Sequence, residues 1–74
     1  MEEKVKIPQE VYEGIVAVRA SGLTNMLDMG MVAHYACELG FPDAADWLSD
    51  ANNKRRYSEG IFKGFEPEED SEKE

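Results

Sequence analysis

Two side chains that could bind a metal or act as nucleophiles stand one helical turn apart, His34 and Cys37. A spacing of three residues would place both on one helical face, within reach of a single ion. A structural zinc site needs four such ligands, and the sequence has one histidine and one cysteine in total. No third group is available to orient the imidazole toward the thiol for nucleophilic catalysis. We therefore expect a core cysteine, a partly exposed histidine, and neither metal nor cofactor.

Carboxylates also recur at helical spacing, as Glu10 with Glu13 and as Asp43, Asp46 and Asp50. General acid–base catalysis needs a cleft that shifts the pKa of one carboxyl, and the surface of a short helix does not supply one. The sequence contains neither a calcium loop of the Asp-x-Asp-x-Asp-Gly type nor a glycine-rich phosphate loop. We expect these acids to be solvated charges that favour helix N-termini, and we predict that the chain is not an enzyme.

The only basic cluster is Lys54, Arg55 and Arg56, followed by Tyr57. Such a triplet could hold a phosphate backbone while the tyrosine ring stacks on a base. The net charge of −8 opposes this, because an acidic chain repels a polyanion at long range. The triplet is expected to be a solvated patch, or one that pairs with the chain's own acidic C-terminal residues.

Adaptable apolar side chains are densest between residues 23 and 31, where two helices are expected to meet. Methionine is common at surfaces that bind partners. The alternative, which we favour, is that these residues fill the gap where the helices diverge. If they are exposed, they form the contact patch. The candidate partner-binding residues are Leu23, Met26, Leu27 and Met29. A candidate charged rim around them consists of Lys54, Arg55, Arg56, Asp43, Asp46 and Asp50.

Helical periodicity organises most of the chain. Apolar residues at i, i+4 and i+7 predict a helix over residues 9–20 that ends at Gly22, with Gly14 allowing another helix to approach closely. A second helix is predicted over residues 28–39, ended by a Schellman-type stop at Gly40 and Phe41. Thr24, Asn25 and Asp28 each carry a short side-chain oxygen that could cap the start of this second helix.

The remaining segments are shorter. A third helix is predicted over residues 43–51, with Trp47 as a core anchor. Residues 54–63 favour a fourth helix that places Tyr57 and Ile61 on one face, with Phe62 and Phe65 completing the contact, although an extended ending near Gly60 stays open. Residues 1–6 have no core pattern and are expected to be a frayed lead-in.

We therefore expect an all-α domain, a small bundle of three to four short helices, over residues 1–65, with a disordered acidic tail at residues 66–74. No apolar run approaches the roughly 20 residues that a membrane span needs. The charged N-terminus has no apolar signal region, and a single cysteine suits a reducing compartment. These features predict a soluble, cytoplasmic protein.

The string Ser-Gly-Leu-Thr-Asn-Met-Leu-Asp at residues 21–28 is uncommon. It is followed in order by Ala33 and Ala36, Leu39-Gly40-Phe41, Ala45-x-Trp47-Leu48, Asn52-Asn53, Tyr57 and Ile61. Together these residues resemble a family of small proteins encoded by phages and prophages of Gram-positive bacteria and classified as a domain of unknown function. The resemblance covers residues 10–65 and brings no catalytic residues with it. It implies a phage accessory protein that acts inside a bacterial cell.

These features lead us to expect a non-enzymatic phage-type accessory protein that binds and modulates a bacterial host protein, for example as an inhibitor of host defence. One alternative is nucleic-acid mimicry, in which the helical carboxylates occupy the groove of a DNA- or RNA-binding protein. A second and weaker alternative is nucleic-acid binding through the basic cluster. A homodimer has equal weight with these, because a chain of about 65 ordered residues has a marginal core.

Overall fold

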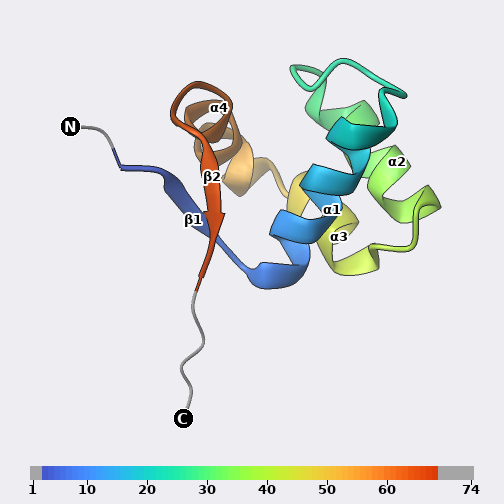
Figure 1. Ribbon diagram of the computed structural model, residues 1–74, viewed down its shortest axis with the longest axis horizontal. Helices are drawn as coiled ribbons and strands as arrows, with labels where there is room; N and C mark the ends of the chain where they lie inside the picture. The colour runs from blue at the N-terminus through green and yellow to red at the C-terminus, as the bar shows by residue number, and fades with distance from the viewer. Residues whose placement is uncertain (1–2, 69–74) are drawn as a thin grey trace, which may run out of the picture.

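The computed structural model describes residues 3–68, which form a helical body and a small parallel sheet (Figure 1). The described elements are β1 (Val5–Ile7), α1 (Gln9–Ser21), α2 (Met29–Glu38), α3 (Pro42–Ser49), the 3-10 turn η1 (Ala51–Asn53), α4 (Lys54–Lys63) and β2 (Phe65–Pro67). The predicted helices are confirmed, including the fourth, whose conformation the sequence left open. The all-α class is corrected, because two strands pair. None of the helices in residues 3–68 has the length and apolar character needed to cross a membrane.

The helical body, α1 to α3, is closest packed at Gly14. A Cβ atom built on Gly14 would lie 2.4 Å from the Cβ of Ala44 and 3.1 Å from that of Phe41. Real Cβ atoms do not approach so closely, so only glycine lets α3 lie this near α1. The expectation that Gly14 permits a close helix approach is confirmed.

Both predicted helix ends in the body are formed by glycines with positive φ. Gly22 follows α1 with φ of 67°, and its N–H donates to the Arg19 carbonyl at 3.3 Å. After α2, the Phe41 N–H donates to the Ala36 carbonyl at 2.8 Å and the Gly40 N–H to the Cys37 carbonyl at 3.1 Å. This pair of bonds is the Schellman motif that the sequence predicts.

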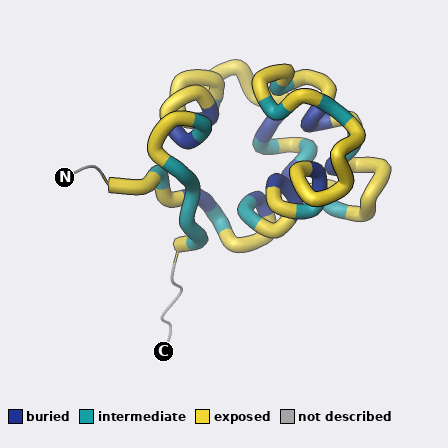
Figure 2. Tube along the Cα trace, turned by 45° about the horizontal axis from the view of Figure 1, so that its top comes forward, coloured by how far each residue is buried: buried dark blue, intermediate teal, exposed yellow. Residues whose placement is uncertain are grey.

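The core lies between the helices, and the buried stretches face inward in Figure 2. Its fully buried members are mainly aliphatic: Ile7, Val11, Ile15, Val18, Val32, Ala33, Ala36, Ala44 and Leu48, with Tyr57. Trp47 is only half-buried and packs against this core from its flank, so its predicted role as the core anchor is wrong. The bulky indole does not fit where α1 and α3 meet through glycine and alanine.

The parallel sheet joins the two ends of the described chain. Val5 pairs with Phe65 and Ile7 with Pro67, and Ile7 is fully buried. The frayed lead-in expected at residues 1–6 is therefore wrong from Val5 onward. Likewise Pro67 belongs to β2 rather than to a tail that begins at residue 66. The rest of the expected tail, residues 69–74, lies outside the described residues.

Each edge of this sheet has a position that is unfavourable for pairing with a further strand. The Val5 N–H and the Ile7 carbonyl face β2, so the Lys6 carbonyl faces the outer edge of β1, where the Arg56 guanidinium donates a hydrogen bond to it. On β2, Pro67 has no N–H to offer to another chain. The sheet therefore holds α4 in place and does not offer a good edge for adding a further strand.

A second close approach fixes the end of α4. A Cβ on Gly60 would lie 2.0 Å from the ring of Phe65, so the glycine that weakens the helix makes room for that ring. The ring also packs against Tyr57, with centroids 5.6 Å apart. Gly60 lowers the helix propensity of α4, but it also makes the space that lets β2 fold back onto this helix.

Candidate protein-binding surface

The turn between α1 and α2 presents two leucines to solvent. Leu23 is 51% exposed and Leu27 is 70% exposed, and Met31 in the first turn of α2 is also exposed. Met26 and Met29, predicted with them, are half-buried and pack against the core. We call Leu23, Leu27 and Met31 the corner surface. The structure therefore divides the four candidate residues into two that are exposed, Leu23 and Leu27, and two that pack against the core, Met26 and Met29.

Short polar side chains hold the backbone that carries these leucines. The Ser21 hydroxyl donates to the Val18 carbonyl at 2.6 Å and accepts the Leu23 N–H at 3.2 Å. The Asn25 side-chain oxygen accepts the Leu27 N–H at 2.8 Å. The backbone N–H of each leucine is thus held by a side chain within the turn. The backbone is therefore not free to turn the leucine side chain into the core, and the side chain stays in solvent.

The far end of the turn is fixed to α2 and to α4. The Asp28 carboxylate accepts the Met31 N–H at 3.2 Å, so Asp28, one of the three predicted candidates, is the N-cap of α2. The Tyr57 hydroxyl donates to the Met26 carbonyl. Burial, aided by the nearby Asp28 carboxylate, raises the pKa of Tyr57 to about 12, so the hydroxyl remains a donor at every physiological pH.

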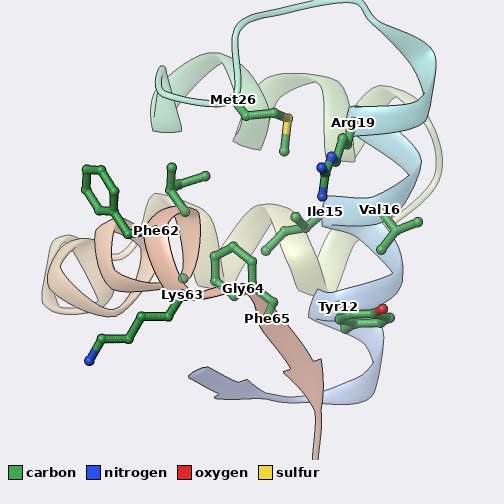
Figure 3. A pocket seen from close by; sticks show the side chains of 11 residues that line it. Tyr12, Ile15, Val16, Arg19, Met26, Phe62, Lys63, Gly64 and Phe65 are labelled. Atoms are coloured by element: carbon green, nitrogen blue, oxygen red, sulfur yellow. The ribbon is translucent and has the colours of Figure 1, made fainter. Parts of the chain in front are cut away.

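A second exposed apolar feature is a cleft of about 520 Å³ between α1 and the α4–β2 segment (Figure 3). Ile15, Met26 and Phe65 point into this space, and Arg19 reaches toward it from α1. Phe62 stands at its lip with its ring turned outward and is 86% exposed, which corrects the expected packing of this residue on the core. We call this feature the α1–α4 cleft.

Comparison with known families gives one match. The family described as "Domain of unknown function (DUF5049)" matches residues 7–65. The chain belongs to the DUF5049 family. The match begins at the last residue of β1 and ends at the first residue of β2, so it contains the whole helical body, the corner surface and the cleft. No curated protein and no solved structure gives a significant match.

Charge is segregated in this DUF5049 domain. Residues 8–53 contain seven acidic side chains, all exposed, and one base, Arg19. The described residues outside that range, on β1, α4 and β2, contain six bases and four acids. The helical body is therefore strongly acidic, and the α4–sheet end is weakly basic. Sequence order hides this pattern, because the two basic segments come from opposite ends of the chain.

The predicted charged rim is distributed over both regions. Its acids lie on or just after α3, where the Asp50 carboxylate accepts the Asn52 N–H at 2.9 Å. Its bases begin α4, where Arg56 is bound to the β1 backbone. Tyr57 is buried with its hydroxyl bonded, so it is unavailable to stack on a nucleic-acid base. That part of the nucleic-acid alternative is wrong.

His34 and Cys37, one turn apart on α2, are both exposed. His34 contacts the neighbouring Tyr35 ring edge-on, with centroids 5.0 Å apart. Cys37 lies on the surface, which corrects the expectation of a core cysteine. Within residues 3–68, no three histidine, cysteine or acidic side chains are gathered as a metal site would require.

Proposed function

We propose that this DUF5049 domain is a non-enzymatic protein-binding module that contacts its partner through the corner surface. The observation that carries the proposal is the combination of exposed leucines with a backbone held by Ser21, Asn25 and Asp28. Leaving a leucine in water forgoes about 1.5–3 kcal/mol relative to burying it. A small domain with a limited core recovers that free energy only when another surface covers the turn.

The preformed turn also suits binding in its own right. Because the amides of Leu23 and Leu27 are already bonded within the turn, little backbone entropy is lost when a partner covers the side chains. Two leucines on a rigid support suit the apolar core of a protein interface, with charged residues left to the rim. We propose the acidic side chains of α3 as part of that rim.

The proposed setting is the interior of a bacterial cell, with a host protein as the partner. This rests on the resemblance of this sequence, including residues 21–28, to phage-encoded small proteins; that stretch carries Leu23 and Leu27 of the corner surface. A phage accessory protein that modulates a host protein, including a component of host defence, needs no catalytic site. It needs a stable surface of the kind that the turn offers.

The test is affinity capture from a bacterial lysate with the full chain as bait. Leu27→Asp places a charge on the corner surface, whereas Leu39→Asp places the same charge on another exposed leucine, 41% exposed against 70% for Leu27, at the other end of α2. The proposal predicts a protein that is retained by the wild type and by Leu39→Asp and is lost with Leu27→Asp. Identical retention by all three chains would refute the corner surface as the contact.

A second candidate, nucleic-acid mimicry, is supported by the acidic helical body. In this case the partner is a DNA- or RNA-binding protein, and Asp43, Asp46 and Asp50 stand in for phosphates. Replacing these three aspartates by asparagine would then abolish binding, and the wild-type affinity would fall steeply with salt. Salt-insensitive binding that survives the triple substitution would exclude mimicry and leave the corner surface unaffected.

A further inference from the structure

The α1–α4 cleft has the opposite charge character to the rest of the chain. The sequence contains 16 acidic and 8 basic residues, yet the lining of the cleft includes Arg19 and Lys63 and no carboxylate. Its α1 wall presents Tyr12, Val16 and Arg19 at i, i+4 and i+7, a continuous helical stripe. Such a stripe, apolar along most of its length and cationic at one end, fits an apolar helix face that carries a carboxylate.

The chain itself carries such a face on the outside of α4. Phe62 is the most exposed large apolar side chain among the described residues. Glu59 lies one turn before it and is also exposed, so the two share one face of the helix. An aromatic side chain buries about 150–250 Å² when it is covered, more than any other single residue on this surface could contribute.

We propose that two copies of this chain form a twofold dimer in which Phe62 of each copy occupies the α1–α4 cleft of the other. Because the outward ring and the hollow belong to the same molecule, a twofold axis makes the contact twice and closes the assembly. The corner surface remains outside the contact, so the dimer presents two copies of it.

Charge determines how the helices lie across this contact. On α1, Arg19 is one turn after Val16, and Glu13 is one turn before it. If α4 of one copy runs antiparallel to α1 of the other, Glu59 faces Arg19 of the other copy. The parallel arrangement would place Glu59 against Glu13 instead. Like charges in contact are unfavourable, so the antiparallel arrangement is selected.

The dimer is expected to be weak. Two Phe62 rings and the cleft walls fall short of the interface of about 1,200 Å² that stable complexes bury. Two chains of net charge −8 also repel each other, and moderate salt screens this repulsion. Association should therefore be measured at moderate salt and at protein concentrations extending well above the micromolar range.

Sedimentation velocity of the full chain tests the contact. The wild type is expected to shift from monomer to dimer as its concentration rises. Phe62→Ser is expected to raise the dissociation constant by more than about tenfold. Leu39→Ser, which removes an exposed apolar side chain outside the lining of the cleft, is expected to leave it unchanged. Phe62 makes little contact within one copy, so Phe62→Ser should keep its circular dichroism spectrum. A wild type that stays monomeric throughout would overturn the dimer.

A charge swap tests the arrangement. Arg19→Glu alone and Glu59→Arg alone each place like charges across both contacts and should weaken association. An equimolar mixture of the two variants restores opposite charges in both contacts and should form a heterodimer about as readily as the wild type forms a dimer. A mixture that associates no better than either variant would overturn the antiparallel contact. Leu27→Asp should dimerise normally, which separates this inference from the proposed partner contact.

Discussion

The helical body and the α4–sheet end are held together in different ways. In the body, α1, α2 and α3 share a continuous aliphatic core and meet closely at Gly14. At the other end, α4 adds only Tyr57 to this buried core, with Ile61 packed against it. The rest of its attachment is through the Tyr57 hydroxyl, the Arg56 guanidinium and the approach of Phe65 to Gly60. A core distributes its free energy over many side chains, whereas point attachments each carry a large share. Both proposed binding surfaces lie beside these attachments.

The largest effect is predicted at Gly14. In Gly14→Val the new side chain overlaps Ala44 and Phe41, and we expect the free energy of unfolding to fall by about 3 kcal/mol, near the limit for overpacking. Gly30 is a matched control, because it is also helical and a Cβ there would meet only Asp28 at 3.7 Å. Gly30→Ala should stabilise by about 0.5–1 kcal/mol through helix propensity. Urea unfolding measures both, and equal effects would refute the close approach.

Gly60 tests the attachment of β2. Gly60→Ala forces the Phe65 ring off α4, and we expect a loss of about 2 kcal/mol that is smaller than at Gly14, because a side chain yields more easily than a helix. If the clash with the ring is the cause, removing the ring should matter less once Gly60 is replaced. Phe65→Ala should then lower the free energy of unfolding less in the Gly60→Ala chain than in the wild type. Additive losses in the double-mutant cycle would indicate another cause.

Tyr57 tests the attachment of the corner turn to α4. Tyr57→Phe leaves the Met26 carbonyl without its partner, and we expect about 1 kcal/mol of lost stability.

The raised pKa of the Tyr57 phenol also leads us to expect a pH-dependent stability. The phenol ionises near pH 10 when unfolded and near 12 when folded, so its contribution is fully present below pH 10 and is lost as pH rises toward 12. Urea unfolding of the wild type between about pH 10 and 12 should show this loss in the free energy of unfolding. Tyr57→Phe should lack the part of the loss that Tyr57 causes.

The smallest effect on stability is predicted on the corner surface. Leu27 is mostly exposed and makes its hydrogen bond through its backbone N–H, so Leu27→Ser should unfold within about 0.5 kcal/mol of the wild type. Thermal unfolding followed by circular dichroism measures this. A large loss would mean that Leu27 supports the fold rather than a partner contact.

The two regions also differ in how far the sequence predicts them. In the body, helical period, the two positive-φ glycines and the close approach at Gly14 are local signals, and the structure confirms them. At the other end, β1 and β2 have three residues each, too few to show a strand period, and they pair across the length of the chain. Helical period predicted the buried position of Tyr57. The expectation that Phe62 completes this contact was wrong, because a sequence pattern cannot show where a supporting surface ends.

The candidate binding surface was likewise predictable only in its local features. The sequence placed the apolar cluster at the turn, and Asp28 at the start of α2. It could not divide the four candidate residues, because which side chains face the core depends on how α4 closes over Met26. The cleft was missed for the same reason, since its walls come from α1 and from the last part of the described chain.

The most direct test of the partner contact is titration calorimetry of the captured protein with purified wild type, Leu27→Ser and Leu39→Ser. A buried leucine contributes enough that Leu27→Ser should weaken binding by at least about tenfold, while Leu39→Ser binds like the wild type. Equal affinities for all three chains would contradict the assignment of the corner surface as the partner contact.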